Sequence, residues 1–190
     1  MSTLVIMFRT VSLLALAGML LGVGRRRGKS KARAHRRGAG RGPVVANFAA
    51  FGLFFPSLII FYGSANGFTA LLLASTGSLL AIAGVALVLR SRAALGPAWS
   101  LVPKAGQETG LVTNGPYRLV RHPIYLGLTL LAMGEALAFS CWPAFLIVLA
   151  GIVPTFAWRA RVEETLLSRT FGKRYVLYQK QTKMIFPYLF

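Results

Sequence analysis

The sequence predicts an all-α integral membrane protein with about five transmembrane helices, the last two forming a C-terminal helical hairpin. Composition is the first reason, because 55% of the 190 residues are hydrophobic and the mean hydropathy is +0.61, above the range of soluble domains. The second reason is that 22 Lys and Arg, against 4 Asp and Glu, lie almost entirely between long apolar runs. In a soluble chain a net charge of +18 would indicate nucleic acid. Because apolar runs separate the charges, we expect no nucleic-acid partner.

Three of the expected spans lie in the first half of the chain, since a bilayer core requires about 20 apolar residues per helix. They cover residues 4–23, interrupted by Arg9, residues 44–62 and residues 68–89. A signal peptide is the alternative interpretation of the first segment. No small-x-small cleavage site precedes Arg25, and the positive charges follow the apolar run, so we expect a retained helix.

The second half contains one apolar run, residues 124–158, that is too long for a single span. Ser140, Trp142 and Pro143 interrupt its middle. We therefore predict a tight hairpin with spans at residues 124–139 and 143–158, the second kinked by Pro154. The chain divides into residues 1–94, N-terminal transmembrane helices with a basic cytoplasmic loop at 25–42, and residues 95–190, one structural unit that contains the helical hairpin.

Lys and Arg accumulate on the cytoplasmic side of membrane proteins, which tests the five-span arrangement. Residues 25–41, 90–121 and 159–183 hold 9, 5 and 7 of them, which is 21 of the 22. Five spans place all three segments on one face, and the connections "GSANG" and "SCWP" on the other face carry no charge. We predict a multi-pass protein with its N-terminus outside and its C-terminus in the cytoplasm, in a bacterial plasma membrane rather than an endoplasmic reticulum.

The basic loop at 25–42 is rich in Gly and of low complexity, which is typical of a disordered segment. It is either a determinant of topology alone or also a site that attracts anionic lipid. Cys141 is the only cysteine, so no intrachain disulfide and no cysteine metal site is expected. We interpret it as a buried apolar thiol.

The motif "RHPIYLG" predicts a helix start at the cytoplasmic surface. His122 precedes a proline and is thereby disfavoured in helical conformation, whereas Pro123 suits the first helical position. The positive end of that helix, next to Arg121, would suit an anion. A purely structural helix start is the alternative.

The motif "RARVEETLL" follows the hairpin's second span. Because a hairpin returns its two ends to the same depth, we expect Arg159, Glu163 and Glu164 to emerge beside His122 and Tyr125. Arg159 and Glu163 are four residues apart and would also form an ordinary helical ion pair. Glu164 points about 100° away from Glu163. Paired carboxylates near a cationic, aromatic helix start suit a ligand with groups of both charges, such as S-adenosylmethionine.

The stretch "LGPAWSLVPKAGQETGLVTNGPYRLVRHPIYLG" followed by "RARVEETLLSRTFGKRYVLYQK" resembles the isoprenylcysteine carboxyl methyltransferase and phospholipid methyltransferase family of integral membrane enzymes. The resemblance covers about residues 95–187. It implies a methyltransferase that uses S-adenosyl-L-methionine. The isoprenylcysteine enzymes generally have a longer acidic run and a bulkier N-terminal helical region, so the cofactor site carries over better than the substrate does.

Carried over residue by residue, the resemblance implies a cofactor site and one substrate contact. Arg159 is the expected catalytic residue that contacts substrate. The cofactor-binding residues are expected to be Thr109, Gly110, Leu111, Val112, Tyr117, His122, Pro123, Ile124, Tyr125, Glu163 and Glu164, with no metal. Of these, Glu164 is included because it is the carboxylate next to Glu163.

The expected partner is a membrane lipid or lipophilic small molecule, with a carboxylate of the isoprenylcysteine kind as the favoured acceptor. Three alternatives remain: a phospholipid amine N-methyltransferase, an NADPH-dependent membrane reductase, and a non-catalytic membrane subunit or transporter. The terminal "FGKRYVLYQKQ" is expected to form an amphipathic helix, either an interfacial anchor or a lid with Phe171, Tyr175 and Tyr178 turned inward. Glu135, deep in the fourth span, is either functional or bonded to another helix.

Overall fold

The structure is a computed structural model that describes residues 3–24, 41–63, 65–96 and 110–186. The basic loop at 25–42 therefore lies almost wholly outside the described residues. The described part is helical and contains no strand, apart from an isolated bridge between Val120 and Lys183. Its elements are α1 (Thr3–Gly24), α2 (Arg41–Ile60), α3 (Gly67–Leu95), the 3-10 helix η2 (Gly115–Arg118), α4 (Pro123–Ala138), α5 (Trp142–Ile147), the π-helical turn η3 (Val148–Ile152), α6 (Val153–Phe171) and α7 (Lys173–Gln181).

Each of the five expected spans coincides with apolar helix, which confirms the all-α integral membrane class. Three helices are long and apolar enough to cross a bilayer, namely Gly42–Ile60, Gly67–Leu95 and Trp142–Phe171. The apolar helices Thr3–Gly18 and Pro123–Ala138 are shorter. The expected hairpin is present, because α4 ends at Ala138 and the next helix begins at Trp142.

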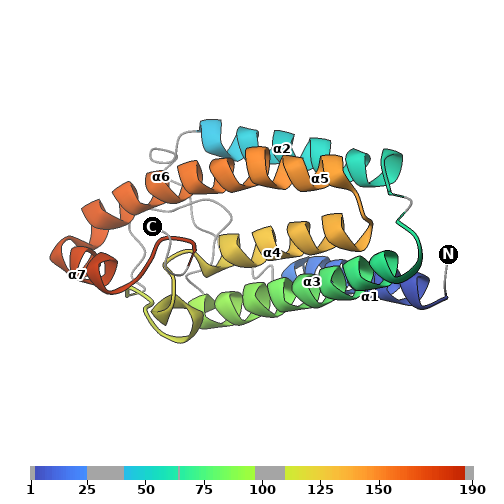
Figure 1. The fold of residues 1–190 in the computed structure, drawn as a ribbon. Coiled ribbons are helices and arrows are strands. Elements are labelled where there is room, and N and C mark those ends of the chain that lie inside the picture. The colour runs from blue at the N-terminus through green and yellow to red at the C-terminus, as the bar shows by residue number, and fades with distance from the viewer. Residues whose placement is uncertain (1–2, 25–40, 64, 97–109, 187–190) are drawn as a thin grey trace.

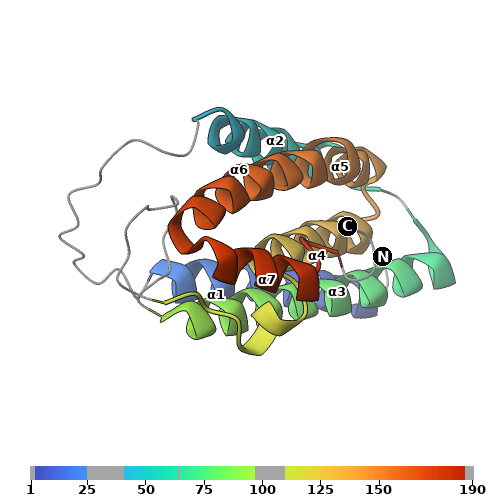
Figure 2. The same ribbon diagram turned by 90° about the vertical axis from the view of Figure 1, so that its left-hand side faces the viewer.

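The helices form two layers (Figures 1 and 2). One layer contains α1, α3 and α4, and the other contains α2 against the continuous run of α5, η3 and α6. The layers approach each other most closely where α4 meets α5 and η3, next to the hairpin turn. Figure 1 shows α4 and α6 diverging from that turn toward the end of the bundle where α7 lies. We call this the polar end, and the region between α4 and α6 the wedge.

Glycines bring α3 and α4 into backbone contact. A Cβ atom on Gly77 would lie 2.4 Å from the backbone N of Ala138, and one on Gly84 would lie 2.5 Å from the carbonyl O of Gly127. A Cβ on Gly134 would in turn meet the carbonyl O of Gly77 at 2.5 Å. Small residues allow such close approach between membrane helices, where packing replaces the hydrophobic effect as the driving force. The position of α4, and so of the helix start at Pro123, is thus set by α3.

The helix after the hairpin turn is continuous through Pro154, where a kink was expected. Its irregularity is the π-helical turn Val148–Ile152, which ends just before the proline. Such turns accommodate a residue that cannot donate its backbone N–H to the regular helical pattern. The helix therefore continues past the apolar region and carries Arg159, Glu163 and Glu164 to the polar end.

The far end of the bundle contains the polar contacts of α1. Arg9 Nε donates to the carbonyl O of Ala138 at 2.8 Å, and Ser12 Oγ donates to Glu135 Oε2 at 3.1 Å. Glu135, 1% exposed, is therefore bonded to another helix, as the second interpretation expected. Cys141 is buried as expected, and its thiol donates to the carbonyl O of Ser57 at 3.3 Å.

Candidate active site

The turn before α4 has the backbone that the sequence predicts. His122 adopts φ −122° and ψ 61°, outside the helical region, and α4 begins at Pro123. The backbone N–H groups of Arg121 and His122 donate to the carbonyl oxygens of Lys183 and Met184, at 2.8 and 2.9 Å. The last described segment of the chain therefore fixes this turn.

Glu163 lies where the hairpin argument places it, beside the start of α4. Its Oε1 accepts a hydrogen bond from the Tyr125 hydroxyl and another from Arg159 Nε at 3.1 Å. Its second oxygen, Oε2, lies 3.6 Å from Nδ1 of His122. The ion pair with Arg159 is thus real, but it is part of a larger group that joins α4 to α6.

Glu164 is held by a different set of groups. Its Oε1 lies 2.5 Å from Arg121 Nε and 3.5 Å from His122 Nε2, and its Oε2 accepts from Gln179 Nε2 at 3.1 Å. Burial alone would raise the pKa of Glu164, but the contacts with His122 and Arg121 outweigh burial and lower that pKa to about 2. Glu164 is therefore a carboxylate held by several protein donors, whereas Oε2 of Glu163 accepts no hydrogen bond from the described residues and lies 3.6 Å from Nδ1 of His122.

Three rings are stacked between α4 and α6. The His122 and Tyr125 rings are 5.4 Å apart and inclined by 4°, and the Tyr125 and Phe156 rings are 4.9 Å apart and inclined by 8°. The guanidinium carbon of Arg159 lies 5.6 Å from the centre of the Tyr125 ring. Tyr125 is the middle ring of this stack, which joins the start of α4 to α6.

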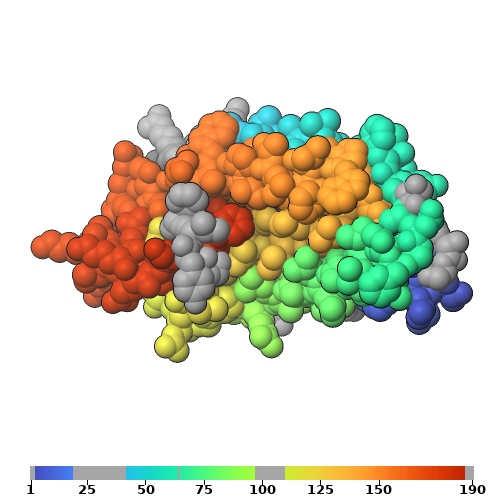
Figure 3. Space-filling model, in the orientation of Figure 1, coloured from blue at the N-terminus to red at the C-terminus, as the bar shows by residue number. Residues whose placement is uncertain are grey.

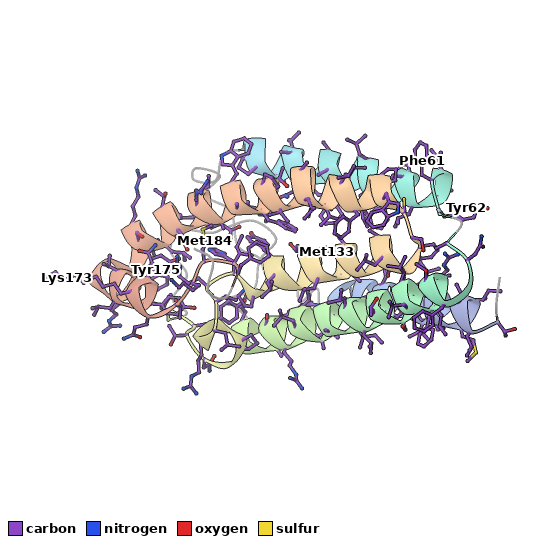
Figure 4. The ribbon with its side chains drawn as sticks, in the orientation of Figure 1. Phe61, Tyr62, Met133, Lys173, Tyr175 and Met184 are labelled. Atoms are coloured by element: carbon purple, nitrogen blue, oxygen red, sulfur yellow. The ribbon has the colours of Figure 1, made fainter. Side chains whose placement is uncertain are left out.

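Helix α7 covers the polar end. It runs across the bundle, so it is seen nearly end-on in Figure 1 and lengthwise in Figure 2. Tyr175 and Tyr178 are 1% and 7% exposed, which confirms that both turn inward, while Lys173 points away (Figure 4). The Tyr178 hydroxyl donates to the carbonyl O of Tyr117 at 2.6 Å. Val176 and Leu177 on the same helix are 45% and 60% exposed, so the inward tyrosines suit a lid and the outward apolar side chains suit an interfacial anchor.

Burial also changes the pKa of Tyr178 in α7 and of Tyr117 in η2. It raises the pKa of Tyr178 to about 12, with Arg121 opposing the change. Burial likewise raises the pKa of Tyr117, to which Tyr178 and Glu163 add. Both phenols are therefore neutral hydrogen-bonding groups at physiological pH.

Two buried polar atoms at this end form no hydrogen bond with the described residues: the hydroxyl of Tyr175, and Nε2 of His122, whose contact with Glu164 Oε1 is 3.5 Å long. Buried polar atoms in folded proteins are nearly always paired, so unpaired ones in a site indicate a ligand or water. Together with Oε2 of Glu163, they offer donors and an acceptor to a polar ligand beside the aromatic stack. This donor set fits the amino group, carboxylate and ribose hydroxyls of S-adenosylmethionine.

Comparison with known proteins identifies the family of the chain. Residues 72–174, more than half of the chain, match the phospholipid methyltransferase family. The chain belongs to this family. The matched region extends from α3 to the start of α7 and includes the RHP turn, the aromatic stack and both glutamates.

Curated relatives of this phospholipid methyltransferase family member are isoprenylcysteine enzymes. Protein-S-isoprenylcysteine O-methyltransferases A and B of Arabidopsis thaliana are 34% identical over 84 residues and 35% identical over 80 residues. These stretches cover 44% and 42% of this chain and 42% and 40% of the relatives. The enzyme of the same name from Schizosaccharomyces pombe is 31% identical over 84 residues, 44% of this chain and 36% of that protein. The matches span less than half the length of these relatives.

A solved structure shares the fold. It is that of the eukaryotic intramembrane Ras methyltransferase, isoprenylcysteine carboxyl methyltransferase, solved without a monobody. The TM-score is 0.59 at 19% identity, over 98% of this chain and 64% of that one. At this identity the likeness establishes the membrane fold.

The site residues expected from the sequence of this family member do not all lie at the polar end. Thr109 lies outside the described residues, Gly110 is exposed, and Leu111 and Val112 are half-buried just ahead of η2. Tyr117 is buried in η2. The remaining expected residues lie together at the polar end, namely His122, Pro123, Ile124, Tyr125, Arg159, Glu163 and Glu164.

Two parts of this site were not predicted from the sequence. Phe156 extends the aromatic stack, and residues 182–186 bond to the turn before α4. Phe156 carried no distinguishing signal, because one more aromatic residue in an apolar span is ordinary. Residues 182–186 follow the last expected helix and contain no motif, so neither could be found without the tertiary fold.

Proposed function

We propose that this protein is an S-adenosylmethionine-dependent methyltransferase that acts at the membrane on a hydrophobic acceptor carrying a carboxylate, of the isoprenylcysteine kind. The observation that carries the proposal is the position of Glu163, whose carboxylate meets Tyr125, His122 and Arg159 at the mouth of the hairpin. Membership of a methyltransferase family and the named activity of the relatives support it.

The cofactor site in this proposal comprises Glu163, the His122–Tyr125 stack and the lid. Glu163 Oε2 would accept from an amino or hydroxyl group, while His122 Nε2 and the Tyr175 hydroxyl would take the remaining polar groups. When bound, S-adenosylmethionine supplies an electrophilic methyl group, and its sulfonium becomes a neutral thioether as the methyl group leaves.

Arg159 is the proposed contact for the acceptor carboxylate. Its Nε is bonded to Glu163 at 3.1 Å and its guanidinium lies over the Tyr125 ring, so the planar group is held in one orientation. A carboxylate is already ionised at neutral pH and is matched in shape by a guanidinium. An amine acceptor would first have to lose a proton and would be repelled by Arg159.

The chemical work left to the protein is placement. An oxygen lone pair of the acceptor carboxylate would form the new O–CH3 bond while the C–S bond breaks and leaves its electron pair on sulfur, so the protein would have no proton to move. Arg159 would orient the attacking oxygen, and alignment of this kind contributes several kcal/mol, about 7 to 11 at its upper range. Helix α7, with Tyr175 and Tyr178 inward, would keep water out of the reacting region.

The proposal includes an orientation. Five spans would place the segments that hold 21 of the 22 Lys and Arg on one side of the membrane, so the polar end would face the cytoplasm and the N-terminus the outside. A soluble cofactor would then reach the site from the cytoplasm, and a lipophilic acceptor would reach it from the bilayer.

Two measurements on the purified protein in lipid nanodiscs test the proposal. Calorimetric titration should show binding of S-adenosylmethionine and none of NADPH, and the reverse would favour the reductase. Labelled cofactor with N-acetyl-S-farnesylcysteine or with phosphatidylethanolamine then separates the acceptors. Label in the first product supports the carboxylate assignment, whereas label in the second alone would assign the protein to phospholipid amine methylation. Binding of neither cofactor would indicate a non-catalytic subunit.

A further inference from the structure

Residues 182–186, here called the tail, are bound back onto the candidate site. The carbonyl oxygens of Lys183 and Met184 accept from the backbone N–H groups of Arg121 and His122, at 2.8 and 2.9 Å. Arg121 Nη1 also donates to the carbonyl oxygens of Gln179, at 3.1 Å, and Thr182. The tail is therefore attached to Arg121 and His122, the two residues immediately before α4.

The tail enters the wedge, where α4 and α6 diverge. Figure 1 shows it turning back from α7 toward the middle of the bundle, and in the space-filling view of Figure 3 its red atoms lie between the orange α6 and the yellow-orange α4. Figure 4 places Met184 between the same two helices, with Met133 of α4 directed into this region. Met133 and Met184 both pack on one core cluster, which includes Tyr125 and Phe156.

The three apolar side chains of the tail differ in burial. Ile185 is 2% exposed and belongs to that core cluster, so it anchors the tail. Met184 and Phe186 are half-buried and pack against the cluster from its edge. They therefore lie at the boundary between the inside of the wedge and its surroundings, next to the aromatic stack that the acceptor must reach.

Resting on the proposed function, we propose that Met184 and Phe186 are specificity-determining residues that contact the apolar chain of the acceptor. An acceptor whose carboxylate meets Arg159 would lay its chain along the edge of the core cluster that contains Tyr125 and Phe156, where Met184 and Phe186 pack. A flexible methionine adapts to chains of different shape. The tail thus sets how much chain the wedge accommodates, while Ile185 and the two backbone hydrogen bonds keep it in place.

The test compares acceptors that share a head group and differ in chain length: the S-geranyl, S-farnesyl and S-geranylgeranyl derivatives of N-acetylcysteine. Shortening either side chain leaves space that the longest acceptor chain can fill, whereas the shortest chain loses contacts. Met184→Ala and Phe186→Ala should each raise the ratio of kcat/KM for the geranylgeranyl over the geranyl acceptor by about tenfold, within the range known for a few methylenes in an apolar pocket. Leu177→Ala, on the exposed side of α7 at 60% exposure, is the matched control and should leave the ratio unchanged.

A ratio is used because a variant that merely folds less well loses activity equally on all three acceptors. Equal loss, or no change, in both tail variants would overturn the proposal. A farnesyl analogue with a diazirine at the end of its chain provides a readout without turnover, and it should label the peptide that contains Met184 and Phe186. Absence of methyl transfer by the unaltered protein would refute the proposed function, whereas labelling of the tail would still support a contact between the tail and the apolar chain. Labelling of other peptides alone would refute that contact.

Discussion

Arg121 and Glu164, 43 positions apart in the sequence, form a charged hydrogen bond of 2.5 Å with side chains 10% and 13% exposed. The contact ties the turn before α4 to α6, and Arg121 extends it to the end of α7 through the carbonyl oxygens of Gln179 and Thr182. Three segments that border the candidate site are thus joined at one arginine. Breaking such a pair on one side leaves a buried charge without compensation.

The first prediction concerns acid stability. The ordinary pKa of Glu164 is 4.5 and its folded pKa is about 2, so the folded state binds its proton more weakly than the unfolded state. Its contribution is complete above pH 4.5, is lost as the pH falls through the folded value, and amounts to at most about 3 kcal/mol. Thermal unfolding of the detergent-solubilised protein should therefore show Glu164→Gln less stable than the unaltered chain at neutral pH, with the difference shrinking toward pH 2.

Glu135→Gln is the control for that experiment, because it makes the same chemical change at the opposite end of α4 from His122. If the gap between Glu164→Gln and the unaltered protein stayed constant across the acid range, the contact with Arg121 would not depend on the charge of Glu164, and the low pKa would be wrong.

The second prediction concerns the contact between α3 and α4. Gly77→Ala would place a methyl group 2.4 Å from a backbone atom of α4, so the helices must separate, at a cost of about 1 to 3 kcal/mol. Gly52→Ala, in α2 with no heavy atom within 4 Å of the added carbon, should be neutral or slightly stabilising. Denaturation midpoints of the two variants would decide, and equal midpoints would show that the α3–α4 contact is looser than described.

The parts of this fold that were predictable from sequence depend on short-range rules. The conformation of His122 follows from the proline after it, and the hairpin follows from the length of the apolar run, so the meeting of Tyr125 with Glu163 could be derived. The partner of Glu164 could not, because nothing local selects Arg121 from the other cations on the same side. The place of Ile185 depends on the divergence of α4 and α6, a tertiary property with no periodic pattern.

The third prediction tests the orientation. Lys180→Cys in α7 and Asn66→Cys before α3 introduce thiols at exposed positions on opposite ends of the bundle. A membrane-impermeant maleimide added to intact cells should label Cys at position 66 and not at position 180. The native Cys141 is 1% exposed and should not react. Labelling at position 180 from outside would reverse the orientation and place the candidate site away from the cytoplasm.

The fourth prediction concerns cofactor binding. Glu163→Gln keeps the size of the side chain and removes its charge, so the proposed contact with an amino or hydroxyl group weakens. Affinity for S-adenosylmethionine should fall by about 1.5 to 3 kcal/mol, the range for hydrogen bonds to charged groups. Titration calorimetry measures it, with Glu135→Gln as the chemically identical change far from the site. Equal affinities in both variants would remove Glu163 from the cofactor site.

The last prediction distinguishes the role of Arg159 from that of Glu163. Arg159→Lys keeps a positive charge beside Glu163 but loses the planar group that the Tyr125 ring and the Nε hydrogen bond orient. Turnover of a carboxylate acceptor should fall by about tenfold or more, the cost of one imperfectly placed contact, while S-adenosylmethionine affinity stays nearly constant. Arg161→Lys, two residues further along α6 and exposed, is the matched control and should change neither. A loss of cofactor binding in Arg159→Lys would instead show that Arg159 belongs to the cofactor site, by way of its hydrogen bond to Glu163. Methylation of phosphatidylethanolamine by the variant at the rate of the unaltered protein would show that no carboxylate is recognised at this position, because an amine acceptor gains nothing from a guanidinium.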